Sequence, residues 1–366
     1  MLSQDTALTA PASDNSRTTG DTMTPIARME ESIEFNPDLP FIAVTHDMPD
    51  TDAKVCLWFI KTFIAAPAGR EMKWCFVRSG ERLPIMEGTG YNVIHVDTGF
   101  GRFDQHGLQM ERGSSFQLLA EQYGCSEEPG IKELVELTRA TDSVEKVDPC
   151  SVHYVFKALR STVKTESGLP DWDGILKIAF VILDSLYSHH CSVAAGDENF
   201  KENGKLEELR GGIKLCVNLF QNIHQEAAMR AGANVVLWCK KNKGKMIVGV
   251  QTDGLRLGNV CAALRFAEAQ ARNISLSVTD LSQFGTLERQ PTWFAHRSNR
   301  LILAGSLTHK PKEDEYTKLS PSLIAFIVRV ALSNPSMSPD KVVRTAREER
   351  RKDSDQKAKQ TSKTEN

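Results

Sequence analysis

The segment from Thr45 to Ala53 places one imidazole and two carboxylates within seven residues, at His46, Asp50 and Asp52. Nitrogen and oxygen ligands of this kind suit manganese, magnesium or cobalt better than metals that prefer thiolates. The spacing does not decide the matter alone, since Asp52 is equally well explained as a cap of the helix that follows. The segment therefore predicts part of a metal site, and further acids are needed to complete it.

Three later segments add acids in a fixed order. Asp97 follows an apolar run, Asp104, Gln105 and His106 come soon after it, and Asp142 closes a helical stretch. Carboxylates that crowd together repel one another unless a cation neutralises them. If the fold brings these segments together, they predict a centre for divalent cations.

The elements needed to bring them together alternate along the chain. We expect strands at 41–45, 73–78 and 91–96, and helices at 53–65, 114–123 and 131–141. Thr51 and Asp52 are expected to supply the cap and the acidic first turn of the first helix. Such alternation is typical of an α/β fold with a doubly wound parallel sheet, in which ligands bind at the carboxyl ends of the strands.

The rest of the chain predicts a second, smaller α+β domain. Helices are expected at 171–190 and 206–231, then a hairpin of 235–240 with 245–251, a helix at 257–272, strands at 274–278 and 301–304, and a helix at 321–332. Residues 1–37 and 334–366 are expected to be a disordered leader and a disordered charged tail. The domains would then be 38–200, with the acids and a helical linker, and 201–333, which would bind substrate.

Composition excludes several classes of protein. The 366 residues suffice for two domains, and a net charge of -2 provides no overall basic field for binding long duplexes. The eight cysteines form no C-x-x-C pair, which argues against a zinc ribbon or a disulfide framework. We find no apolar stretch of membrane-spanning length and no secretory signal, and so expect a soluble, cytoplasmic protein without membrane contact.

The ordered acids resemble the DHH phosphoesterase superfamily over roughly residues 40 to 145. The resemblance is carried by His46-x-x-Pro49-Asp50-x-Asp52, Asp97, Asp104-x-His106 and Asp142. A second resemblance is to the Myg family of DHH-like exonucleases. It is carried by Arg102-Phe103-Asp104, Phe294-Ala-His296 and Ala304-Gly305-Ser306-Leu307-Thr308-His309.

The resemblance implies two divalent cations, most simply Mn²⁺, with Mg²⁺ or Co²⁺ as alternatives. It assigns His46 and Asp50 to one cation, and Asp52 and Asp142 to the other. Asp97 would bridge the pair, His106 would face the substrate phosphate, and Asp104 would orient His106. The sequence departs from the motif at Gln105, where a metal-binding imidazole has become an amide that ligates transition metals poorly.

The function predicted on this basis is hydrolysis of phosphodiester bonds in short single-stranded nucleic acids or nucleotides, as in an exonuclease or phosphodiesterase. One alternative is an inorganic pyrophosphatase-like hydrolase. Another is a DHH-fold binding protein that has lost turnover through Gln105. Candidate substrate-binding residues are Arg102, His296, Ser306 and Thr308, although polar loop residues are common on any surface. The oligomeric state stays open.

Overall fold

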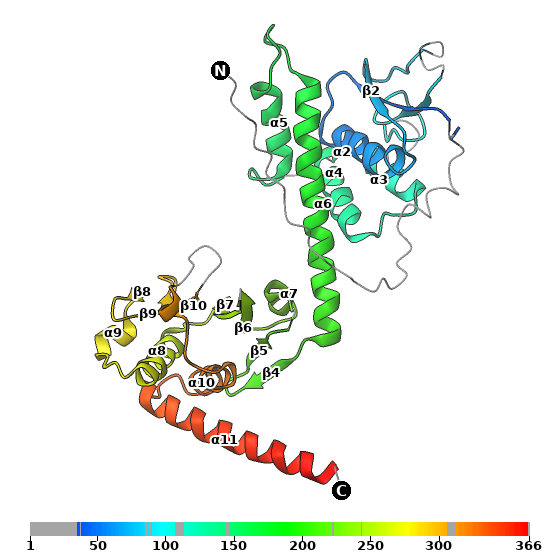
Figure 1. The fold of residues 1–366 in the computed structure, drawn as a ribbon. Coiled ribbons are helices and arrows are strands. Elements are labelled where there is room, and N and C mark those ends of the chain that lie inside the picture. Colours follow the sequence, from blue (N-terminus) through cyan, green and yellow to red (C-terminus); the bar gives the residue numbers. More distant parts are fainter. Residues whose placement is uncertain are drawn as a thin grey trace, which may run out of the picture. The chain divides into compact units, whose positions relative to one another are not determined.

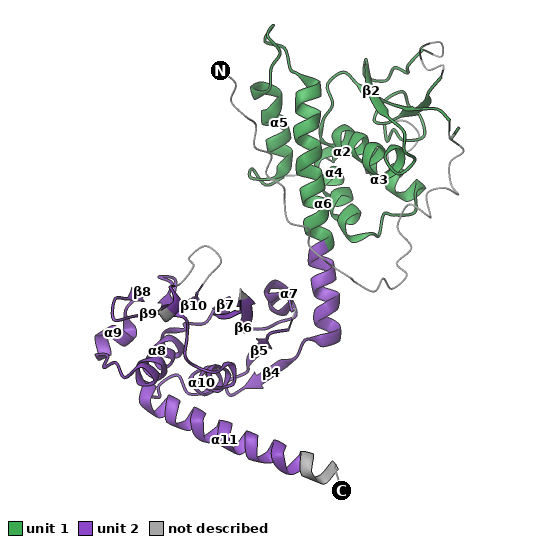
Figure 2. Cartoon of the chain, in the orientation of Figure 1, with its two compact units in different colours: residues 1–191 green, residues 192–366 purple. Residues whose placement is uncertain are grey.

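The computed structural model describes residues 35–36, 38–84, 87, 90–106, 113–143, 147–221, 223–242, 244–305 and 312–364. The chain divides into two compact units, Met1–Cys191 (unit 1) and Ser192–Asn366 (unit 2) (Figure 2). The predicted boundary at residue 200 and this division both fall in one long helix. The predicted leader lies almost wholly outside the described residues.

Unit 1 alternates strands and helices, as the sequence predicted. Its elements in chain order are β1 (Phe41–His46), α2 (Thr51–Phe59), η1 (Ile60–Ala65), β2 (Met72–Val77), β3 (Asn92–His95), α3 (Ser115–Gln122), α4 (Pro129–Asp142), α5 (Val152–Thr162) and α6 (Trp172–Asn203) (Figure 1). The helix α5 was not foreseen, and only Phe156 of its residues is buried.

The three strands of unit 1 form a parallel sheet in the order β2-β1-β3. Ala43 in the central strand pairs with Trp74 on one side and with Ile94 on the other. The parallel α/β prediction is thereby confirmed. Because parallel strands end at the same edge, the residues that follow β1 and β3 are delivered side by side.

The helix α2 begins one residue earlier than its predicted cap implied. Asp50 is the N-cap, and its Oδ1 accepts a hydrogen bond from the Ala53 amide over 3.0 Å. Asp52 sits in the first turn and points elsewhere. From Ile60 the helix widens into the π-helix η1, so the predicted single helix 53–65 is two elements.

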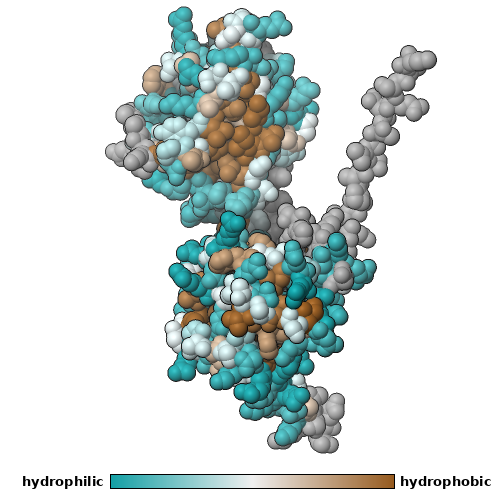
Figure 3. Space-filling view, turned by 90° about the vertical axis from the view of Figure 1, so that its left-hand side faces the viewer, coloured by the Kyte–Doolittle hydropathy of each residue, from teal (hydrophilic) through white to brown (hydrophobic). Residues whose placement is uncertain are grey.

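The long helix α6 packs on the core of unit 1 with one side only. Leu176, Ala179 and Leu183 are fully buried, whereas Ile178 and Val181 are 40% and 65% exposed. Figure 3 shows the molecule from the left-hand side of Figure 1, with a broad hydrophobic area on the surface of unit 1. By length and composition alone, α6 is the one helix among the described residues that could cross a membrane. The sequence predicted no stretch of that length and composition.

Unit 2 is built on a seven-stranded mixed sheet in the order β4-β5-β6-β7-β10-β9-β8. Its elements are β4 (Leu206–Leu209), β5 (Ile213–Leu219), α7 (Gln225–Arg230), β6 (Val235–Asn242), β7 (Lys245–Thr252), α8 (Gly258–Arg272), α9 (Val278–Ser282), β8 (Gly285–Leu287), β9 (Gln290–Ala295), β10 (Leu301–Ala304), η3 (Glu313–Glu315), α10 (Pro321–Ser333) and α11 (Pro339–Thr364). The predicted hairpin is the antiparallel pair β6 and β7.

Two predicted elements of unit 2 are wrong. The expected helix 206–231 is the hairpin of β4 and β5 followed by the short α7. Gly211 and Gly212 both have positive φ and make the turn, which a continuous helix could not contain. The expected strand 274–278 is a loop leading into α9, because Ser277 and Asp280 form a capping box there.

The predicted disordered tail is also wrong for residues 339–364, which form the helix α11. Val342, Val343 and Ala346 are 0–1% exposed and join the core beneath α8 and α10. Beyond them the helix is strongly charged and mostly exposed. Three apolar residues at helical spacing thus anchor a segment whose composition alone suggested a solvated tail.

Candidate metal centre

The sheet edge brings His46 and Asp97 into contact. His46 is the last residue of β1, and its Nε2 lies 3.2 Å from Asp97 Oδ2, just beyond β3. Asp50, at the start of α2, joins them. One ligand atom from each of His46, Asp50 and Asp97 lies within 4.8 Å of the others. The structure therefore gathers the three residues that sequence reasoning assigned to one cation and the bridge.

A tight turn holds Asp97 in place. Its φ of 53° lies in the left-handed region, and its amide donates to the Phe103 carbonyl over 2.9 Å. Gly99 has a φ of 76°, and a Cβ there would lie 2.7 Å from Arg82 Cγ. A non-glycine residue in this conformation is uncommon and recurs at functional sites. The backbone is thus shaped to present the Asp97 carboxylate.

Asp104 organises the segment that carries His106. Its Oδ2 accepts from the Phe100 amide over 2.7 Å, and its Oδ1 accepts from the His106 amide over 3.0 Å. The same Oδ1 lies 3.0 Å from His106 Nδ1, the contact expected of a residue that orients the imidazole. The side chain of His106 is 63% exposed, so it is free to meet a ligand.

Gln105 and Asp142 lie on the other side of Asp97. The Gln105 Nε2 donates to Asp97 Oδ1 over 3.3 Å and to Asp142 Oδ2 over 3.1 Å. Asp142 is the last residue of α4. The amide is buried and therefore forms part of the carboxylate cluster itself.

Asp52 points from α2 toward α3. Its Oδ2 accepts from the Ser115 amide over 2.7 Å, and its Oδ1 accepts from the Phe116 amide over 2.9 Å. It thus caps the N-terminus of α3, whereas the sequence placed it at its own helix. The role of Asp52 as a metal ligand stays a prediction.

Burial raises the pKa of three of these carboxyl groups. The pKa of Asp52 rises well above its usual value through desolvation and then through the charges of Asp142, Asp97 and Asp50. Burial also raises the pKa of Asp97, against the hydrogen bond from His46. The pKa of Asp142 rises to about 7 through burial and the charges of Asp50 and Asp97. Without a cation the cluster holds its protons tightly.

The pKa of the His46 imidazole is also raised. Burial alone would lower the pKa of His46, but the hydrogen bond and the charge of Asp97 outweigh it and raise the pKa. No Lys or Arg of the described residues forms an ion pair with the carboxylates of Asp50, Asp52, Asp97 or Asp142. One imidazole nitrogen among several carboxylate oxygens is a donor set that fits a divalent cation such as Mn²⁺.

Sequence reasoning missed two residues that support the centre. Lys54 is 3% exposed, and its ammonium donates to the carbonyls of Pro49 and Asp50, which fastens the loop between β1 and α2. Ser115 donates from its amide to Asp52 and from its hydroxyl to Gln105. A lysine inside an apolar helix run was the signal for the first. For Ser115 no local signal existed.

Among the described residues, neither Arg102 nor His296 forms a hydrogen bond or ion pair with the carboxylate cluster. Arg102 donates to the Gln122 side chain, and its guanidinium lies 5.6 Å from the Phe103 ring centroid. His296 belongs to unit 2, where its Nδ1 lies 2.8 Å from the Ser298 hydroxyl. Ser306 and Thr308 lie outside the described residues. Their substrate-binding roles stay predictions.

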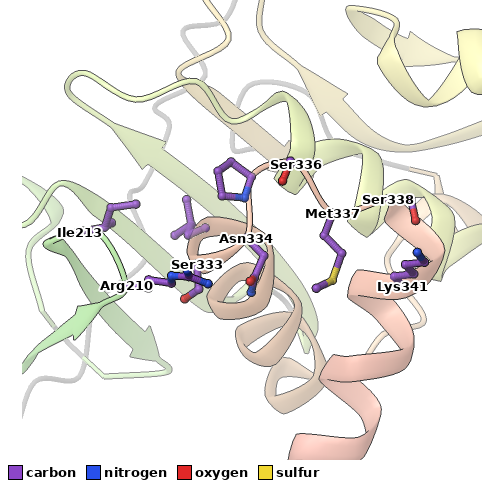
Figure 4. A pocket seen from close by; sticks show the side chains of 11 residues that line it. Arg210, Ile213, Ser333, Asn334, Ser336, Met337, Ser338 and Lys341 are labelled. Atoms are coloured by element: carbon purple, nitrogen blue, oxygen red, sulfur yellow. The ribbon is translucent and has the colours of Figure 1, made fainter.

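A cavity of about 750 Å³ opens in unit 2 beside the start of α11 (Figure 4). Arg210, Asn334 and Lys341 are among its lining residues. None of the residues predicted to bind metal or substrate borders it. The residues that line the cavity all belong to unit 2, whereas the carboxylate cluster belongs to unit 1.

Comparison with known proteins adds little to this picture. No family model matches the chain, and no curated protein matches it. Among solved structures, the pGpG-specific phosphodiesterase PggH from Vibrio cholerae aligns over 62% of this chain and 88% of its own, with 13% sequence identity and a TM-score of 0.29. A likeness at that score establishes neither a shared fold nor a shared activity.

Proposed function

We propose that this protein is a metal-dependent phosphoesterase that hydrolyses phosphodiester bonds of nucleotides or of short single-stranded nucleic acids. The observation that carries the proposal is the meeting of His46, Asp50 and Asp97 at one sheet edge, with ligand atoms within 4.8 Å of one another. The DHH-like order of the motifs gives this cluster its assignment to phosphate chemistry.

The unbalanced charge of the cluster supports a cation there. The carboxylates of the cluster face two imidazoles, His46 and His106, and no Lys or Arg of the described residues forms an ion pair with them. A structural cluster of this kind would be costly, because like charges in a low dielectric repel strongly. A divalent cation bound by these oxygens would remove that repulsion and would polarise a phosphoryl oxygen of the substrate.

The chain's own residues have defined tasks in this proposal. The exposed imidazole of His106, held by Asp104 at 3.0 Å, would hydrogen-bond a non-bridging phosphate oxygen and stabilise charge that builds there. The turn at Asp97 holds its carboxylate rigidly between His46 and Gln105. The Lys54 ammonium holds Asp50 in place before α2 by donating a hydrogen bond to the Asp50 carbonyl over 2.8 Å.

The test is hydrolysis of bis(p-nitrophenyl) phosphate and of short dinucleotides, measured with and without Mn²⁺. We expect activity only with the cation, and a loss of at least about 100-fold in Asp97→Asn, since even outer partners of a metal ligand are worth 10–100-fold. Asn keeps the size of Asp and tolerates the left-handed backbone, so the fold should persist.

The matched control is Glu133→Gln on the exposed side of α4, which makes the same chemical change away from the cluster. It should retain full activity. Release of phosphate from pyrophosphate, with no diester cleavage, would favour a pyrophosphatase-like hydrolase instead. Tight cation binding without turnover of any of these substrates would overturn the enzyme proposal and favour a binding protein.

A further inference from the structure

The Gln105 amide stands where the DHH motif order places a metal-binding imidazole. Its side chain is 7% exposed, and its Nε2 donates to one oxygen of Asp97 and one of Asp142, over 3.3 and 3.1 Å. Its Oε1 accepts from the Ser115 hydroxyl. An amide nitrogen has two hydrogens, so both are used, and an ionised carboxylate could not accept from the amide oxygen. The orientation of Gln105 is therefore set by its partners.

Asp52, on the same side of the cluster, accepts from nitrogen donors and also contacts the carboxyl group of Asp142. It is 0% exposed, and each of its oxygens accepts a backbone N–H from the first turn of α3. The positive end of the α3 dipole further favours its negative charge. Asp52 thus works as an anchor between α2 and α3.

The side of His46 and Asp50 differs. Asp97 divides its oxygens, with Oδ1 toward Gln105 and Oδ2 toward His46 at 3.2 Å. Asp50 is exposed and uses Oδ1 to cap α2, and no N–H or O–H of the described residues donates to its Oδ2. The ligand atoms on this side can close on a cation without breaking a hydrogen bond to the backbone.

We propose that the centre holds one divalent cation per chain, on His46, Asp50 and Asp97, and that the Gln105 amide takes the place of a second. The inference rests on the proposed metal centre and deepens it. Two N–H donors supply partial positive charge to Asp97 and Asp142, where a second cation would otherwise draw their oxygens together.

A second group of donors does not provide the missing site. Ligand atoms of Asp97, Asp104 and His106 also lie within 4.8 Å of one another. However, both oxygens of Asp104 accept backbone N–H groups, and His106 Nδ1 is held by one of them. This group orients His106, and both oxygens of Asp104 are already engaged in hydrogen bonds.

The experiment counts Mn²⁺ per chain, by calorimetric titration and by metal analysis after gel filtration of the full chain. We expect one Mn²⁺ in the wild type, with the six-line resonance of an isolated ion. In Gln105→His we expect two, with the spectrum of an exchange-coupled pair. Gln117→His, the same change on α3 at a side chain that bonds Glu121, is the matched control and should bind one.

The outcomes separate this inference from the proposed function. Two cations in the wild type would overturn the single-cation centre and leave the phosphoesterase proposal standing. The single-cation inference would also be overturned if Gln105→His bound only one cation while its melting temperature equalled that of the wild type, because the variant would then be folded. No cation in either protein would contradict the metal centre itself. One bound cation without diester cleavage would support the inference and count against the enzyme.

Discussion

Each unit of the molecule buries charged groups, but the two clusters are balanced in opposite ways. In unit 2, Arg265 is 0% exposed and its Nη atoms donate to five backbone carbonyls. Nearby, Glu268 is also 0% exposed and accepts from Arg272, Trp293, Thr317 and the Lys318 amide. In unit 1 the buried carboxylates meet mainly one another, the imidazoles of His46 and His106, and neutral N–H groups.

The difference teaches that burial of charge is not in itself a sign of function. A buried ion pair with satisfied hydrogen bonds is a structural device that holds α8 to the neighbouring loops. Crowded carboxylates without a Lys or Arg partner are costly to the empty protein, and they are explained by a ligand that brings the missing charge. The candidate site is distinguished by an excess of negative charge over positive charge, rather than by the burial of charged groups.

The largest expected effect is on stability, at the cluster of Glu268 and Arg272 in unit 2. Glu268→Gln removes the charge that Arg272 binds at 2.7 Å and should lower the free energy of unfolding by about 3 kcal/mol, since it breaks an ion pair whose carboxylate is fully buried. Urea titration would measure the loss. Mn²⁺ binding should be unchanged, and a variant as stable as the wild type would remove the contrast between the clusters.

The acidic cluster should respond in the opposite direction when its charge is removed. The pKa of Asp142 is raised from 3.8 to about 7, so the folded protein holds a proton that the unfolded chain has already released. This stability is complete below about pH 4 and is lost as the pH rises through 7. The melting temperature of the metal-free protein should therefore fall over that window.

Asp142→Asn should flatten this fall and stabilise the metal-free protein at pH 7, by on the order of 2 kcal/mol after allowance for solvent screening. The measurement is thermal unfolding from pH 4 to 8 in the presence of a chelator. The control is Glu133→Gln, which should follow the wild-type curve. If Asp142→Asn were less stable than the wild type at pH 7, the charge of Asp142 would be stabilising and the cluster would carry no excess of negative charge.

Much of this arrangement could be predicted from sequence, because it depends on local order. The strand ends at His46 and Asp97 follow from apolar runs, and their meeting follows from a parallel sheet. What sequence could not supply was the direction of each side chain. Asp52 was assigned to its own helix or to a metal, yet it caps α3, which begins more than 60 residues later. Tertiary contacts of that range leave no local pattern.

The smallest expected effect concerns the one buried lysine beside the acidic cluster. Lys54 binds two carbonyls of the loop and no carboxylate, so Lys54→Met should cost about 1 kcal/mol of stability while weakening Mn²⁺ binding about 10-fold through a looser Asp50. Titration calorimetry and urea unfolding would measure both. Lys177→Met, at an exposed position of α6, should change neither. A loss of several kcal/mol without weaker binding would mean that Lys54 neutralises the cluster.

The left-handed turn at Asp97 has a consequence for how this position can vary. A φ of 53° admits glycine, asparagine and aspartate with little penalty, and it disfavours longer or branched side chains. Of the three tolerated residues only aspartate carries charge. Asp97→Glu would keep the carboxylate yet fit poorly, and Asp97→Gly would fit well yet ligate nothing. Backbone shape and chemistry thus select the same residue independently, and a random change here can satisfy at most one of them.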